Sequence, residues 1–265
     1  MGDQLRELLF SGDEEDRAVV EEATADGIQA AYDDLIEKAE NGVERQARRY
    51  KQAARLIAPF QPGKAKEAYE KAVALDPTDI WSWIELGRLR AVYDSLDSAE
   101  LAFKNGLQLV SNERDRMALH GEFGKLLFAR GELAKARGEY EAASGIAETL
   151  AESEPGNVEW QRDLSVSYDR LGDVEVAAGN LTAARERFEA GLIIRENLGK
   201  TEPSNADWQR DLSVSYNNLG DVEVATGNLT AARERFEAGL VIAENLTKAE
   251  PGNAEWQRDL SVSYN

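Results

Sequence analysis

The residues that could carry chemistry in this sequence are few. His120 is the only histidine and there is no cysteine, so the usual zinc-binding sets and cysteine nucleophile pairs are missing. The segment GEFGK at residues 121–125 has the composition of a phosphate-binding loop, but it lacks the required spacing and the Ser or Thr after the lysine. We therefore predict a protein that is not an enzyme, with no metal site and no cofactor.

Charge restricts the kinds of partner. The 265 residues include 50 acidic and 31 basic side chains, which give a net charge of −19 at pH 7. Nucleic-acid binders need a basic face, so no nucleic acid is expected, and a protein or peptide partner with a basic segment is favoured. Most carboxylates are expected to be solvated or paired along a helix, as Arg185 would be with Glu189.

The sequence has no feature that would direct the chain to a membrane, so no membrane partner is expected. No apolar run approaches the roughly 18 residues that a spanning helix needs. The N-terminus lacks the basic and apolar regions of a signal peptide. Because the chain has no cysteine, it fits a reducing compartment, and a cytoplasmic location is predicted.

Three tryptophans reveal a repeat that must position any functional residue. Trp160, Trp208 and Trp256 are 48 residues apart, and residues 160–207 and 208–255 differ at nine of 48 positions. A fixed period of this length is typical of a solenoid, in which each unit buries its apolar face against its neighbours.

Each repeat has the pattern of two helices. The first carries an apolar stripe at steps of four, four and three residues, formed by Trp208, Leu212, Tyr216 and Leu219. Asn205 is expected to cap its N-terminus. Gly227 suits the left-handed position that ends a helix, and Asn228 is expected to cap a second helix over about residues 229–250. The sequence thus predicts antiparallel helix pairs joined by tight turns.

This pattern resembles the tetratricopeptide repeat (TPR) family, which places Leu-Gly in the first helix and a small residue and an aromatic residue in the second. The glycine-to-alanine spacing of 12 and the alanine-to-aromatic spacing of four recur at Gly87–Ala99–Phe103, Gly124–Ala136–Tyr140, Gly172–Ala184–Phe188 and Gly220–Ala232–Phe236. A looser first unit keeps the TPR-like ending YEKAVALDP at residues 69–77. The resemblance implies an all-α fold, a right-handed superhelical α-solenoid of antiparallel helix pairs.

The predicted organisation is a short N-terminal segment followed by a repeat array. Residues 1–42 are expected to form an acidic helical cap with a partly disordered start, because the end of a solenoid needs a cover with a polar outer face. The array fills residues 43–265, with units at about 43–77, 78–112, 113–156, 157–204 and 205–252 and a half repeat at 253–265. The 48-residue spacing exceeds the family's usual ~34 and implies longer helices in the later units.

The resemblance also implies a binding surface, because first helices of the TPR family line a concave groove. The matching positions in the N-terminal half are partly apolar and weakly basic: Tyr50, Trp81, Ile84, Arg88, Lys125 and Phe128. Those in the C-terminal half include Asp169, Asp173, Asn217 and Asp221, flanked by valines, with Arg162, Arg210 and Arg258 one turn earlier. Since Trp83 takes the core position, Trp81 is either an exposed binding residue or is covered by the cap or by helix packing.

The chain ends inside a repeat. The half repeat would expose Trp256, Leu260 and Tyr264, which are core positions upstream, so these residues are candidates for head-to-tail self-association into a homo-oligomer. Their identity with inner segments favours a cut through a longer array over a natural final helix. The main prediction is a non-catalytic protein–protein interaction scaffold, which by its resemblance to bacterial arrays belongs to a larger multidomain protein. The alternative is a self-assembling repeat protein.

Overall fold

The structure is a computed structural model that describes residues 29–30, 33, 36 and 46–263. Over this part of the chain it contains eleven helices and no strand, as the sequence predicts. The chain divides into two compact units, Met1–Glu132 and Leu133–Asn265, which are called unit 1 and unit 2 below. None of the helices in the described ranges is both long enough and apolar enough to cross a membrane.

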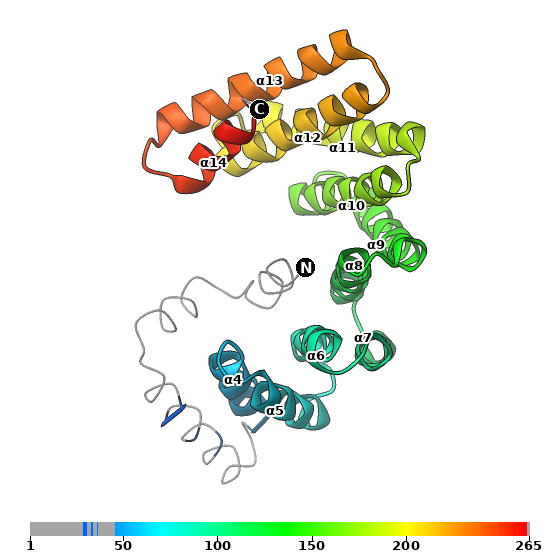
Figure 1. The fold of residues 1–265 in the computed structure, drawn as a ribbon, viewed down its shortest axis with the longest axis vertical. Coiled ribbons are helices and arrows are strands. Elements are labelled where there is room, and N and C mark those ends of the chain that lie inside the picture. Colours follow the sequence, from blue (N-terminus) through cyan, green and yellow to red (C-terminus); the bar gives the residue numbers. More distant parts are fainter. Residues whose placement is uncertain (1–28, 31–32, 34–35, 37–45, 264–265) are drawn as a thin grey trace. The chain divides into compact units, whose positions relative to one another are not determined.

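Unit 1 contains two helix pairs and one further helix (Figure 1). Helices α4 and α5 pack together, α6 packs on α7, and α8 contacts both members of the second pair. Their bounds are Gln46–Ile57 (α4), Pro62–Leu75 (α5), Ile80–Tyr93 (α6), Leu96–Leu109 (α7) and Glu113–Ala129 (α8). In the core, the rings of Phe103 from α7 and Phe123 from α8 stack with centroids 4.8 Å apart. The segment 121–125 lies inside α8, so it forms no phosphate-binding loop.

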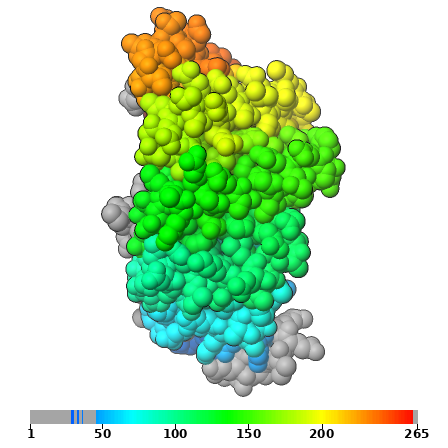
Figure 2. All heavy atoms as spheres, turned by 90° about the vertical axis from the view of Figure 1, so that its right-hand side faces the viewer, coloured from blue at the N-terminus to red at the C-terminus, as the bar shows by residue number. Residues whose placement is uncertain are grey.

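Unit 2 contains the longer helices, most of them 20 or 21 residues. Helix α9 packs on α10, α10 pairs with α11, α12 pairs with α13, and α14 lies against α13. Their bounds are Leu133–Ser153 (α9), Val158–Ala177 (α10), Leu181–Thr201 (α11), Ala206–Ala225 (α12), Leu229–Ala249 (α13) and Ala254–Ser263 (α14). Helices α11 and α12 join one pair to the next, and the space-filling view shows them packed closely (Figure 2).

The helix ends follow the predicted turn chemistry with one correction. The side chain of Asn205 accepts a hydrogen bond from the Trp208 amide, which confirms the cap of α12. Gly227 adopts a φ of 83°, in the left-handed region that ends a helix. Asn228 does precede α13, but its side chain makes no cap. Its Nδ2 instead donates to the buried Glu223 carboxylate at 2.8 Å, so the side-chain amide links the turn to the last part of α12.

The Leu-Gly and aromatic positions meet where the two helices of a pair cross. A Cβ added at Gly220 would lie 2.4 Å from the Phe236 ring, and one added at Gly172 would lie 2.5 Å from the Phe188 ring. Only glycine therefore lets the aromatic ring reach the backbone of the first helix. This close approach is the physical reason for the spacing that the repeats share.

The predicted N-terminal cap falls almost wholly outside the described residues. Of its residues, Gln29 has described contacts: its side-chain oxygen accepts hydrogen bonds from Gln61 at 2.6 Å and from Lys64 at 3.1 Å, both at the start of α5.

Candidate partner-binding site

The first helices of unit 2 display a mixed apolar and polar face. On α10, Val166 and Val176 are exposed, and on α12 the equivalent Val214 and Val224 are exposed as well. Between the valines lie the polar residues predicted for the groove, which are Asp169, Asp173, Asn217 and Asp221. These eight residues are called the first-helix face. Exposed valines interleaved with polar groups suit contact with another polypeptide.

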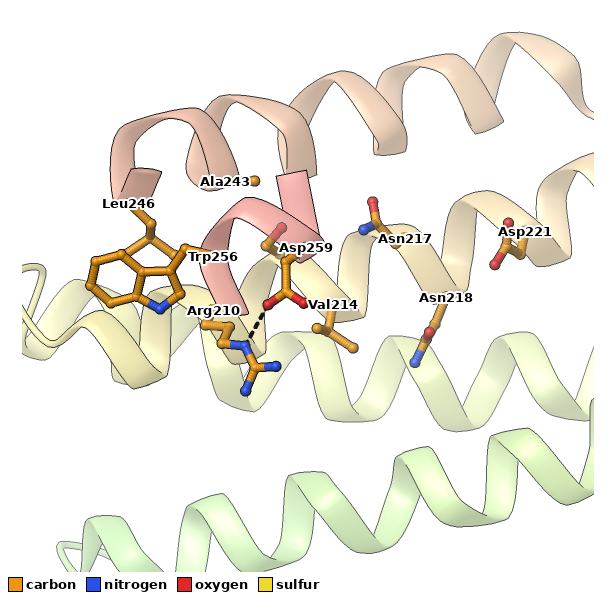
Figure 3. Close-up of a pocket in the computed structure, with 10 residues that line it drawn as sticks. Arg210, Val214, Asn217, Asn218, Asp221, Ala243, Leu246, Trp256 and Asp259 are labelled. Atoms are coloured by element: carbon orange, nitrogen blue, oxygen red, sulfur yellow. Dashed lines mark hydrogen bonds and ion pairs between the residues drawn. The ribbon is translucent and has the colours of Figure 1, made fainter. Parts of the chain in front are cut away.

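A pocket opens on this face (Figure 3). It has a volume of about 180 Å³ and is built from three helices, α12, α13 and α14. Its lining residues are Arg210, Ser213, Val214, Asn217, Asn218, Asp221, Ala243, Leu246, Trp256 and Asp259. The structure thus brings together four residues that the sequence selected, Arg210, Asn217 and Asp221 for the groove and Trp256 for self-association.

Two arginines beside the first-helix face, Arg162 and Arg210, form ion pairs. Arg162 on α10 donates its Nε to Asp211 on α12 at 2.8 Å. Arg210 on α12 donates its Nε to Asp259 on α14 at 2.5 Å, the bond drawn in Figure 3. Each bond joins one first helix to the next. Arg162 and Arg210 therefore link successive first helices, and each already has a carboxylate partner.

Burial raises the pKa of carboxylates on the first-helix face. Desolvation raises the pKa of Asp173 to about 6, although Arg170 acts in the opposite direction. Desolvation also raises the pKa of Asp169, against the effect of the Arg195 guanidinium, and it raises the pKa of Asp221. A basic group brought to this face would favour the ionised form of each carboxylate, so binding of a cation there releases protons.

Trp81 in unit 1 is exposed, whereas its neighbour Trp83 is not. The side chain of Trp81 is 50% exposed, so packing among the helices does not cover it. Trp83 is buried, and its Nε1 donates to the Pro77 carbonyl oxygen at 2.9 Å. The prediction that the two tryptophans face different surroundings is therefore confirmed, and the role of Trp81 in binding stays a prediction.

Three other groove candidates of unit 1 do not lie on an open surface. Tyr50, Ile84 and Arg88 are all buried, Ile84 completely. Arg88 reaches from α6 to Glu122 on α8 and pairs with Glu85 at 2.8 Å, so it connects helices. The helical period could not reveal these contacts: Arg88 is held by Glu122 of α8, and the ring of Tyr50 lies under Lys71 of α5, 5.0 Å from its Nζ.

The two remaining groove candidates of unit 1 are on α8. Lys125 and Phe128 are half-buried. They are more accessible than Arg88, and their contact with a partner stays a prediction.

Trp256, on the terminal helix α14, is buried. Trp256 is 7% exposed, because α14 lies against α13 and the indole packs beside Leu246 (Figure 3). Leu260 is half-buried, and Tyr264 lies outside the described residues. The expectation that the half repeat would expose Trp256 for self-association was wrong, since a half repeat still has one side on which to pack.

A set of ion pairs between repeats, each made by a buried glutamate and a partly exposed arginine, was missed from the sequence. Arg185 on α11 does not turn to Glu189 but pairs with Glu223 on α12 at 2.6 Å. The equivalent Arg137 pairs with Glu175 one repeat earlier. In each pair the arginine and the glutamate are 38 positions apart in the sequence. This spacing recurs with the repeat, but a search for ion pairs within single helices could not find it.

Comparisons with known proteins agree with this architecture. The family model for the tetratricopeptide repeat matches residues 61–79. The chain is similar to the crystal structure of BtubC (BKLC) from P. vanneervenii, with 18% identity, a TM-score of 0.62, and coverage of 87% of this chain and 94% of that one. It is also similar to MamA, with 18% identity, a TM-score of 0.52, and coverage of 79% and 97%.

A third similar structure comes from Podospora anserina and has nearly identical TPR-like repeats. It shares 20% identity and a TM-score of 0.51, over 81% of this chain and 96% of that one. No curated protein sequence matches the chain significantly. At these identities the solved structures establish the fold.

Proposed function

We propose that this chain, a tetratricopeptide-repeat protein by its family match and its fold, is a non-catalytic scaffold that binds a peptide or protein segment on the first-helix face of unit 2. The observation that carries the proposal is the pocket on that face, which unites Arg210, Asn217 and Asp221. The other three exposed valines of the first-helix face, Val166, Val176 and Val224, extend the contact surface beyond the pocket.

The charge of the chain supports a basic partner. With a net charge of −19, the chain attracts cationic segments during encounter. On the first-helix face itself, Asp173 and Asp221 supply local acceptors. Such a partner would lie along the face with apolar side chains on the valines and basic side chains near the aspartates.

The test compares the same lysine substitution at two exposed valines, one on the first-helix face and one on a second helix. Val214 is 38% exposed on the first-helix face, and Val241 is 57% exposed on the second helix α13. Twelve-residue peptides are first selected on the wild-type chain from a displayed library, and their Kd values are measured by calorimetry. Val214→Lys should weaken binding at least about tenfold, because the change removes apolar contact and places a cation against a basic peptide.

The matched variant Val241→Lys adds the same charge away from the face and should leave the Kd within about twofold. Equal effects of the two variants, or a library that yields no binding peptide, would overturn the proposal.

A further inference from the structure

The two 48-residue repeats of unit 2 differ where the pocket lies. Three of their nine differences line it: Asp169, Arg170 and Arg195 in residues 160–207 are replaced by Asn217, Asn218 and Ala243 in residues 208–255. The seven other lining residues are identical to their counterparts 48 positions earlier. The pocket is therefore produced by a local change on an otherwise repeated framework.

The earlier repeat shows what fills the equivalent space. Arg195 extends from α11 and is only 4% exposed. Its Nη1 donates to Ser215 Oγ on α12 at 2.5 Å and lies 2.5 Å from Asp169 Oδ2 on α10. The guanidinium group thus bridges three helices. In the later repeat the side chain at this position stops at the Cβ of Ala243, and the carboxylate becomes the amide of Asn217.

The size of the pocket suits one side chain. Its volume of about 180 Å³ is below the ~300–1,000 Å³ that is typical of sites for whole small molecules. Val214, Leu246 and Trp256 supply apolar surface for an aliphatic stem, and Ser213, Asn217 and Asp221 supply polar atoms for its tip. A long side chain with an apolar stem and a polar end matches this division.

The charge of the pocket favours a cation. Its ionisable lining residues are Arg210, Asp221 and Asp259, and so carry one more negative than positive charge when ionised. The positive charge of Arg210 does not argue against a cationic guest, because it is paired with Asp259. The equivalent pair of Arg162 with Asp211 is formed one repeat earlier, where Arg195 is buried.

We propose that the pocket receives an arginine side chain from the bound partner, which takes the place that Arg195 occupies in the preceding repeat. The inference rests on the proposed function and specifies the side chain that the first-helix face selects. The partner's guanidinium would lie between α12 and α14 and donate to Asn217, Ser213 or Asp221.

The test rebuilds the earlier repeat in the later one. The double variant Ala243→Arg with Asn217→Asp supplies the chain's own arginine and its carboxylate partner, and should fold because the same pair is already accommodated 48 residues earlier. Circular dichroism and thermal unfolding check the fold. The library-selected peptides should contain an arginine, and their affinity for this variant should fall at least tenfold. Replacing that arginine with citrulline, its neutral isostere, should cause a similar loss on the wild-type chain.

The reciprocal variant opens a second pocket. Arg195→Ala with Asp169→Asn should create in residues 160–207 the arrangement that is found in residues 208–255. With N-acetyl-arginine methylamide as the probe, amide NMR shifts should appear around α10 and α11 in this variant and only around α12, α13 and α14 in the wild type. N-acetyl-citrulline methylamide serves as the neutral control.

The outcomes separate the two proposals. If selected peptides bind the filled and the wild-type pocket equally well, the arginine inference is wrong while the scaffold proposal stands. If they enter the pocket through a side chain other than arginine, the inference is likewise overturned. If the library yields no peptide but N-acetyl-arginine methylamide binds the wild type and not the filled variant, the pocket selects arginine and the scaffold proposal fails.

Discussion

Single carboxylates on the first-helix face lower the stability of the folded chain when they ionise. Burial raises the pKa of Asp173 to about 6, with the nearby Arg170 acting in the opposite direction, whereas an unfolded chain would hold it near 4. The folded state therefore binds the proton more tightly than the unfolded state. Stability contributed by the protonated group is present below about pH 4 and is lost as the pH rises through about 6.

Asp173→Asn should remove this loss. Relative to the variant, the wild type is expected to lose about 2 kcal/mol of unfolding free energy between pH 4 and pH 7, because one pKa unit corresponds to ~1.4 kcal/mol. Urea unfolding at pH 4, 5, 6 and 7 measures the difference. Parallel pH profiles for the two proteins would show that Asp173 does not have the raised pKa.

A glycine at a helix crossing and a glycine on an open helix surface should respond in opposite ways. Gly220→Ala places a Cβ 2.4 Å from the Phe236 ring, so the pair must separate, at a cost of about 1–3 kcal/mol. Gly145→Ala in α9 meets no atom within 4 Å and should stabilise the helix by up to about 1 kcal/mol. Denaturant unfolding of the two variants checks the signs. A Gly220→Ala variant as stable as Gly145→Ala would disprove the role of close approach.

At the scale of elements, buried glutamates join each helix pair to the next. The Glu223 side chain accepts hydrogen bonds from Arg185 of the previous pair at 2.6 Å and from Asn228 of its own turn at 2.8 Å. Its main-chain oxygen also accepts from the Asn228 amide at 2.8 Å. One residue thus positions both the turn and the neighbouring repeat, which keeps the first-helix face in register.

Removing this carboxylate should therefore destabilise unit 2 more than removing a surface pair. Glu223→Ala is expected to cost about 3 kcal/mol, because it removes the carboxylate that the Arg185 guanidinium and the Asn228 amide share and leaves them only the longer, 3.3 Å bonds to the Thr226 hydroxyl. Arg233→Ala is the control, since Arg233 pairs with Glu237 along the exposed surface of α13 and should have no measurable effect. Thermal unfolding compares the two, and similar midpoints would contradict the role of Glu223.

At the scale of the whole molecule, the excess of 19 negative charges should govern encounter with a basic partner. Screening lengths fall from roughly 14 Å to roughly 4 Å between 50 and 500 mM salt, so long-range attraction is largely lost. The Kd of an arginine-containing peptide should rise at least about tenfold over this range in calorimetric titrations. Its citrulline counterpart serves as the control and should change much less. Equal salt dependence would show that the acidic charge does not contribute.

The helix pairs were predictable because their causes are local. The apolar stripe of α12 follows from the helical period, the cap at Asn205 from its side chain, and the turn from Gly227, whose φ is positive. Because the sequence pattern recurs every 48 residues, the same prediction applies to the equivalent helix pair in unit 2. For the same reason the sequence could place Asn217 and Asp221 on one side of a helix before any packing was known.

Packing between helices decided which of these positions stay accessible. Arg88 and Asn217 both belong to groove positions, yet Arg88 is buried by a pair with α8 and Asn217 lines a pocket. Burial depends on neighbours that are distant in the sequence, and a helical period contains no information about them. The pocket needed the packed structure for the same reason, since it exists where Ala243 leaves unfilled the space that Arg195 fills one repeat earlier.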